Sequence, residues 1–159
     1  MPTCSHHRPP PAVTIRSAED ALKPILIVAD SGRKECAVLA CLDAARRPLT
    51  LFVVDDGDGT DRPGHSTDDP CTCRDADLLL QALDCLVLAT ARAGAEIDSV
   101  VLALSRPGRG AIPDPADAEA FRHFEARCVD GGLLLLDWFI VADGEVRSVA
   151  THVGRLPAW

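Results

Sequence analysis

The chain has 159 residues, of which 47% are hydrophobic, and this predicts a single domain with a core of its own. Its formal net charge of −8 disfavours a nucleic-acid partner, because binding to phosphate backbones depends largely on Lys and Arg. No apolar run approaches the roughly 20 residues that span a membrane, and the polar first residues lack the pattern of a secretion signal, so we expect a cytoplasmic protein.

The first third of the chain predicts a tail, a short helix and a β-hairpin. Residues 1–13 are polar and rich in Pro, and we expect them to form a disordered tail. Ser17, followed by two acidic residues, is a predicted helix cap, and Pro24 is predicted to end that helix. Two β-rich runs separated by a polar segment favour a hairpin. The strands expected here are residues 25–28, 36–42 and 49–54.

The rest of the chain alternates helices with strands. Residues 55–74 have the composition of a long surface loop. The next segment, 75–95, is apolar on more than one face, so we expect a helix that is buried on two sides. A continuous apolar run is typical of a central strand covered on both faces. That strand is expected at 99–104, followed by a helix at 114–128 and a strand pair at 133–141 and 146–150. This order predicts an α/β fold with a mixed β-sheet and flanking helices.

Several segments resemble one known family. The sequence VVLALSRPG at residues 100–108 is followed by DPAD at residues 114–117, and LLDWFIVADG stands at residues 135–144. They resemble the RadC-type members of the JAB/MPN (JAMM) family. There, a strand ends in His-Asn-His-Pro-Ser-Gly, Ser-x-x-Asp opens the next helix, and Leu-Leu-Asp-His-x-Ile-Val-x-Asp-Gly follows. The resemblance implies a single-domain JAB/MPN-like fold at 14–152, with a C-terminal tail at 153–159.

In that family the two histidines and the aspartate hold a zinc ion that activates water for peptide or isopeptide cleavage. The positions that correspond to the two histidines, the serine and the aspartate are, in that order, Leu104, Arg106, Asp114 and Asp117. Leucine has no lone pair to offer, and a guanidinium has no acceptor and repels a cation. The resemblance therefore implies a degenerate site around Ser105, with no catalytic residues and no metal or other cofactor expected.

Two interpretations of the acidic residues are open. Asp117 is the remaining zinc ligand and Asp114 a substitute ligand, or both serve the start of the helix. In the second case Asp114 is the N-cap, Pro115 the first helical residue and Asp117 part of the first turn, which accounts for both acids. Arg106 is either a solvated turn residue or the ionic partner of Asp117, so that an internal cation replaces the charge of the zinc.

The seven cysteines fall into different settings. Those within apolar patterns are predicted to be buried, reduced thiols, and these are Cys36, Cys41, Cys85 and Cys128. Cys71 and Cys73 lie in the polar loop near His65, and these three side chains offer ligands that zinc accepts. A zinc site rebuilt from His65, Cys71, Cys73 and Asp117 is the alternative to a domain without metal.

The sequence thus predicts a catalytically inactive RadC-like JAB/MPN domain that acts as a protein-interaction or regulatory module. The expected partner is a protein, either another JAB/MPN-like domain or a second copy of the chain. Trp138, Phe139 and residues 156–159 are candidates for the partner surface, with core packing as the alternative for Trp138. The alternative function is a zinc-dependent peptidase, isopeptidase or other hydrolase with a rebuilt metal site.

Overall fold

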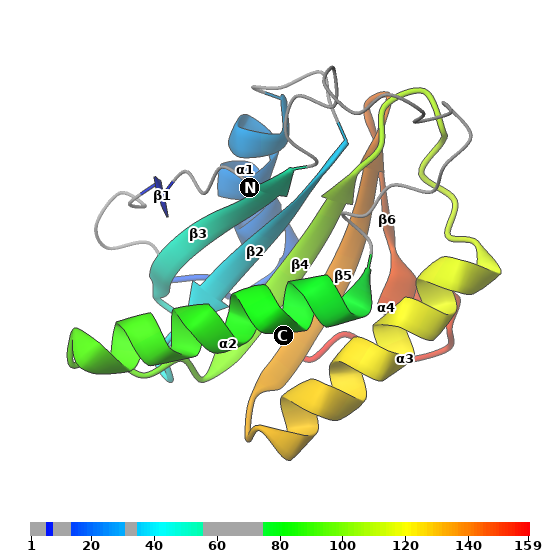
Figure 1. Ribbon diagram of the computed structural model, residues 1–159. Coiled ribbons are helices and arrows are strands. Elements are labelled where there is room, and N and C mark those ends of the chain that lie inside the picture. Colours follow the sequence, from blue (N-terminus) through cyan, green and yellow to red (C-terminus); the bar gives the residue numbers. More distant parts are fainter. Residues whose placement is uncertain (1–5, 8–13, 31–34, 56–74) are drawn as a thin grey trace, which may run out of the picture.

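The computed structural model describes residues 6–7, 14–30, 35–55 and 75–159. Its strands form one mixed sheet in the order β1-β3-β2-β4-β5-β6, in which β1 contributes two residues at the edge (Figure 1). In chain order the elements are β1 (His6–His7), α1 (Ala18–Asp30), β2 (Cys36–Leu42), β3 (Pro48–Asp55), α2 (Ala76–Arg92), β4 (Ser99–Ser105), α3 (Pro115–Asp130), β5 (Leu134–Ala142), β6 (Glu145–Ser148) and α4 (Val149–His152).

The strands β2, β4 and β5 form the centre of the sheet. β2 is antiparallel to both β3 and β4, whereas β4 and β5 run parallel, so the carboxyl ends of β4 and β5 lie at the same edge. Every residue of β2 and β4 is buried, as expected for strands covered on both faces. The predicted α/β class, the hairpin of β2 and β3 and the central strand β4 are confirmed.

Helices cover both faces of the sheet (Figure 1). On one face α2 and α3 bury Leu79, Leu83 and Phe124 against the strands. On the other face α1 buries Ala21 and Ile25 against the same strands. The chain therefore builds two hydrophobic layers that share one sheet.

The predicted end of the first helix at Pro24 and the predicted strand at 25–28 are wrong. Helix α1 continues through Pro24 to Asp30. The side chains of Ala21, Ile25 and Ala29 are all at least 96% buried, and their spacing of four residues follows one face of a helix. Burial of this face outweighs both the β-rich composition of 25–28 and the hydrogen bond that Pro24 cannot make.

Helix α2 buries one face rather than two. Leu79, Leu83 and Leu86 are buried, whereas Leu88 is 62% exposed. Cys85 is also exposed, so its predicted burial is wrong, while Cys36, Cys41 and Cys128 are buried as predicted. Helix α2 has more hydrophobic side chains than the sheet and α3 cover, and the sequence pattern alone does not show which of them stay exposed.

Described residues from both predicted tails contact the sheet. His6–His7 lie within the predicted N-terminal tail and pair with β3, while the rest of that tail lies outside the described residues. In the predicted C-terminal tail, the backbone N–H of Ala158 donates to Leu136 at 3.1 Å. The predicted final strand at 146–150 ends at Ser148, because the Ser148 hydroxyl accepts from the N–H of Thr151 and caps α4.

Candidate functional site

The candidate site lies where β4 ends and α3 begins, at the edge that holds the carboxyl ends of the parallel strands. Arg106 follows β4 directly, and its backbone N–H donates to the carbonyl of Val141 at 2.9 Å. Leu104 is 2% exposed and belongs to the hydrophobic layer under α2 and α3. Ser105, the last residue of β4, is also buried. The side chain of Leu104 is therefore part of the core.

The start of α3 is a capping box. The Asp114 carboxylate accepts from the backbone N–H of Asp117 at 2.9 Å, and the Asp117 carboxylate accepts from the backbone N–H of Asp114 at 2.8 Å. Pro115 occupies the first helical position, where a missing N–H costs nothing. The predicted role of both acids in capping the helix is confirmed.

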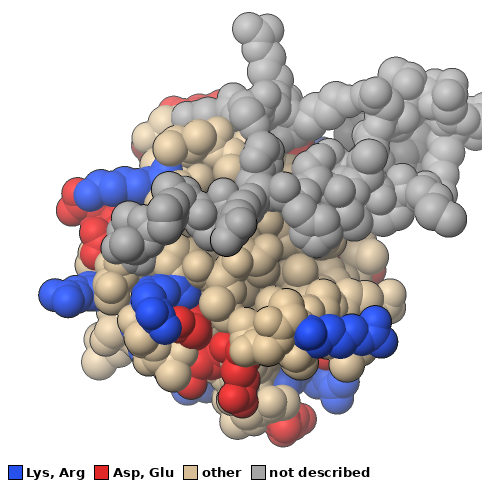
Figure 2. All heavy atoms as spheres, turned by 90° about the vertical axis from the view of Figure 1, so that its left-hand side faces the viewer, with Lys and Arg blue, Asp and Glu red and all other residues tan. Residues whose placement is uncertain are grey.

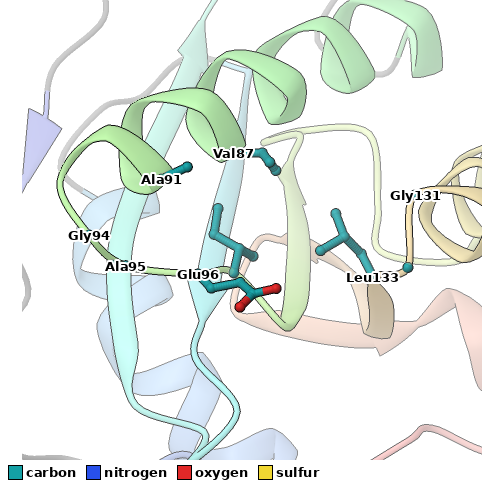
Figure 3. Close-up of a pocket in the computed structure, with 9 residues that line it drawn as sticks. Val87, Ala91, Gly94, Ala95, Glu96, Gly131 and Leu133 are labelled. Carbon is teal, nitrogen blue, oxygen red and sulfur yellow. The ribbon is translucent and has the colours of Figure 1, made fainter.

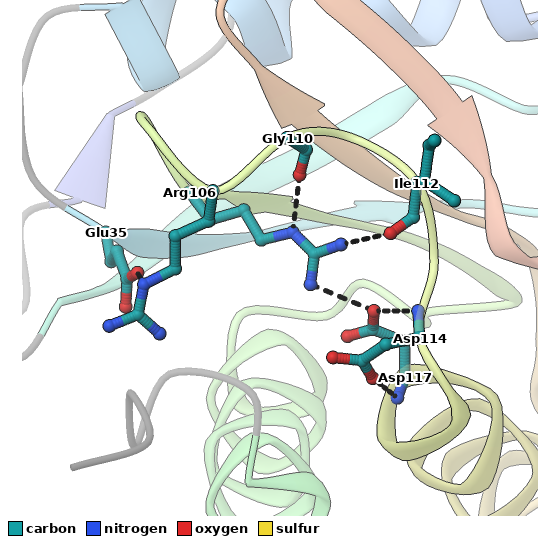
Figure 4. A network of polar contacts seen from close by, with 7 residues as sticks. Glu35, Arg106, Gly110, Ile112, Asp114 and Asp117 are labelled. Atoms are coloured by element: carbon teal, nitrogen blue, oxygen red, sulfur yellow. Dashed lines mark hydrogen bonds and ion pairs between the residues drawn. The ribbon is translucent and has the colours of Figure 1, made fainter. Parts of the chain in front are cut away.

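The guanidinium of Arg106 uses its three nitrogens on three different acceptors (Figure 4). Nη1 donates to Oδ2 of Asp117 at 2.9 Å, Nε donates to the carbonyl of Gly110 at 2.9 Å, and Nη2 donates to the carbonyl of Ile112 at 2.6 Å. The loop between β4 and α3 therefore folds around the guanidinium. Of the two predicted settings for Arg106, the pair with Asp117 is confirmed and the solvated turn is wrong.

This ion pair is buried. The side chain of Arg106 is 9% exposed and that of Asp117 is fully buried. Two buried charges are tolerated when they are paired and their remaining polar atoms are hydrogen-bonded. The backbone carbonyls of the loop meet this requirement for Arg106, and the N–H of Asp114 contributes to it for Asp117.

Two more contacts surround the site, and sequence reasoning did not identify them. Arg109 pairs with Glu35 at 2.8 Å and thus connects the loop to the residue before β2. Both carboxylate oxygens of Asp143 accept from the N–H of Gly108 at 3.1 Å, which joins the loop to the turn between β5 and β6. Both pairs are far apart in sequence, so only the folded sheet brings them together.

The donor set at this site does not suit zinc. Leu104 offers no ligand atom, and the guanidinium of Arg106 lies where a cation would have to share the carboxylate of Asp117. Among the residues that the structure describes, no group of three or more His, Cys, Asp and Glu side chains is placed to hold a metal ion. His65, Cys71 and Cys73 lie outside the described residues.

The residues proposed for a partner surface lie elsewhere. Trp138 is fully buried and packs against Phe121 and Phe124, with ring centroids 6.5 and 6.0 Å away, so core packing is its role. Phe139 is buried on the opposite face of the sheet and stacks on Trp159, at 6.3 Å between centroids. Trp138 and Phe139 therefore pack on opposite faces of the sheet, one in each hydrophobic layer.

Figure 2 shows the side of the molecule that lies at the left of Figure 1. On the described part of this side, Lys and Arg side chains lie beside Asp and Glu side chains, and the basic ones form separate groups. A continuous basic surface of the kind that follows a phosphate backbone is therefore not present on this part of the molecule.

No protein-family model and no curated protein matches the chain. In the described part of the chain, none of the helices has the length and apolar character needed to cross a membrane.

Proposed function

We propose that this chain is a RadC-type JAB/MPN-like domain in which an arginine replaces the zinc centre, and that it acts as a protein-interaction or regulatory module. The observation that carries the proposal is the buried pair of Arg106 and Asp117. The resemblance assigns both positions to zinc ligands, which must lie next to each other in space. They are eleven positions apart in sequence, and their side chains are 2.9 Å apart.

The surrounding elements also support the proposal. The resemblance implies a mixed sheet with flanking helices and a site between a strand end and the next helix start. The pair lies between the end of β4 and the capping box of α3, within such a sheet. The fold class alone is shared by many unrelated proteins, so the position of the pair is the more specific support.

The chemistry of the replacement explains why the domain would keep its fold while losing the reaction. A zinc ion both balances the charge of Asp117 and activates water. The guanidinium of Arg106 supplies only the first of these, because it has no open coordination position for a water molecule. The carbonyls of Gly110 and Ile112 accept from Arg106, so the loop is held in place by the guanidinium. This leaves binding rather than hydrolysis as the function.

The test is to rebuild the zinc site. The Leu104→His/Arg106→His variant carries histidine at both positions that the resemblance assigns to histidine ligands, and we expect about one zinc ion per chain by plasma mass spectrometry and titration calorimetry. Ala103 and Ser105 flank Leu104 in β4, and neighbouring strand residues point to opposite faces. Ala103→His/Ser105→His therefore serves as the matched control and is expected to bind no zinc at this position.

A folded double-histidine variant that binds no zinc would contradict the assignment of these positions. Metal analysis of the reduced wild-type protein tests the alternative hydrolase with a rebuilt site. One zinc per chain that is lost in the Cys71→Ser/Cys73→Ser variant would support that alternative and overturn the proposal. Wild-type protein without zinc, together with a zinc-binding double-histidine variant, would support it.

A further inference from the structure

A groove of about 460 Å³ lies at the C-terminal ends of α2 and α3, away from Arg106 (Figure 3). Val87 and Ala91 of α2 form one wall, and Leu133 of the turn before β5 contributes the other. Ile97, which is buried, also lines the groove. The volume lies within the range of about 300–1,000 Å³ that is usual for binding sites.

The walls of the groove are fixed by the way both helices end. After α2 the N–H of Ala95 donates to the carbonyl of Thr90 at 2.9 Å, and after α3 the N–H of Leu133 donates to Cys128 at 2.8 Å. These bonds are those of a Schellman motif, and Gly94 and Gly132 supply the positive φ that it requires. Both chain segments then enter the sheet, so the groove has a defined shape.

The groove carries negative charge. Glu96 is the one ionisable residue among those that line it, and it is exposed, with no ion pair to another described residue. The two helices also direct their C-terminal ends, which carry partial negative charge, toward it. Arg92 and Arg127 are the basic residues of the last helical turns, and neither lines the groove.

Exposed apolar side chains lie next to the lining residues in sequence. Leu88 is 62% exposed, Val129 is 65% exposed and Leu134 is 41% exposed. Each follows or precedes a lining residue within two positions, whereas most large apolar side chains of the described chain are buried. Exposed large apolar side chains are thus the exception in the described chain, and their position next to lining residues in sequence favours an interaction site at this end of α2 and α3.

We propose that this groove binds a short segment of a protein partner in which a Lys or Arg is flanked by apolar residues. The aliphatic stem of the basic side chain lies on Val87 and Leu133, and its charged end pairs with the carboxylate of Glu96. The flanking apolar residues cover Leu88 and Leu134. A groove volume of about 460 Å³ suits a few side chains of a short segment. The inference depends neither on the resemblance to a family nor on the loss of zinc.

The test uses a random 12-residue peptide library displayed on phage and selected on the immobilised full chain. We expect enriched sequences with Lys or Arg beside apolar residues. The synthetic form of the most enriched peptide is expected to lose about tenfold or more in affinity for Glu96→Lys, since a charge-assisted contact becomes repulsive. Glu119→Lys, with the same charge change on the exposed surface of α3, is the control and should bind as wild type does.

Exchange of the basic residue of the peptide for Glu should restore binding to Glu96→Lys, which a merely structural effect of that substitution would not do. Equal affinity of the peptide for wild type and Glu96→Lys would overturn the proposal. So would a selection that yields no basic and apolar sequences. A dimer in sedimentation that Glu96→Lys dissolves would assign the groove to a second copy of the chain and would also overturn it.

Discussion

At the scale of single residues, the buried charges of Arg106 and Asp117 each need the other for compensation. Removal of one member of a buried pair leaves an uncompensated charge, which typically costs about 3–5 kcal/mol. We therefore expect Arg106→Ala to lower the free energy of unfolding by roughly this amount in urea denaturation. The Arg109 side chain is 47% exposed and pairs with Glu35, so Arg109→Ala should cost about 1 kcal/mol or less.

Comparable stability of the two arginine variants would contradict this role for Arg106. The comparison is informative because both arginines lie in the same loop and both form an ion pair at 2.8–2.9 Å. Burial is the property that separates them.

Asp137 links protonation to stability. Burial raises the pKa of its carboxyl above the ordinary value of 3.8, although hydrogen bonds from Ser148, from the N–H of Trp138 and from the N–H of Ala150 oppose the rise. A carboxyl whose pKa is raised on folding stabilises the folded state while it is protonated. Its contribution to the free energy of unfolding is complete below pH 3.8, and it is lost as the pH rises through the pKa of the folded state.

The expected result is a stability advantage of wild type over Asp137→Asn that decreases as the pH rises above the ordinary carboxyl pKa of 3.8. Urea denaturation at a series of pH values measures the free energy of unfolding of both proteins. The difference between the two values removes the contribution of all groups that titrate alike in both. Glu119→Gln corrects for the change of one net charge. A constant or increasing advantage would show that Asp137 carries its charge in the folded state at little cost.

At the scale of elements, α1 contains a residue that destabilises it. Pro24 lies inside the helix and has no N–H to donate to the carbonyl of Asp20 four residues earlier. Proline in a helix interior costs about 3 kcal/mol, and its restriction of the unfolded chain returns up to about 1 kcal/mol. Pro24→Ala should therefore stabilise the protein by about 2 kcal/mol in thermal or urea unfolding.

Lys23→Ala is the matched control for this prediction. Lys23 is exposed, and its pair with Glu19 at 3.5 Å is a surface contact, so the substitution should change stability by about 0.5 kcal/mol or less. A Pro24→Ala variant that is no more stable than wild type would mean that the helix already compensates for the missing hydrogen bond.

The elements differ in how far the sequence alone predicts them. The hairpin and the central strand follow from local runs of apolar, β-rich residues, and α3 from a capping signal that Asp114 and Pro115 carry on their own. The fate of residues 25–28 depends instead on which face the sheet buries. Their composition favours a strand, and only the tertiary contacts of Ile25 and Ala29 decide for a helix.

At the scale of the whole molecule, the sequence predicted which side chains form the candidate site. It did not predict the backbone hydrogen bonds that surround them. The family resemblance puts Arg106 and Asp117 at two zinc-ligand positions and so predicts that they can pair. The carbonyls of Gly110 and Ile112 carry no side-chain signal in the sequence, because every residue has a carbonyl. The groove beside Glu96 combines the ends of two helices that are far apart in the sequence, and no local pattern encodes that these ends lie side by side.

The two faces of the sheet are covered unequally. Two long helices lie over one face, whereas the other has α1 and the C-terminal residues. Trp159 stacks on Phe139 with an angle of 18° between the rings, and Arg46 donates to the carbonyl of Ala158 at 3.3 Å. The end of the chain is thus a structural part of the layer that contains Leu136.

Removal of this aromatic contact should weaken the whole molecule. We expect Trp159→Ala to lower the free energy of unfolding by about 2 kcal/mol, because partly buried indole surface and one ring stack are lost. Leu156→Ala lies in the same segment, but Leu156 is 94% exposed, so its effect should stay within about 0.5 kcal/mol. Urea denaturation followed by circular dichroism compares both variants without relying on the removed fluorophore. If Trp159→Ala were as stable as wild type, the C-terminal segment would lie on the sheet without holding it together, and α1 alone would stabilise that face.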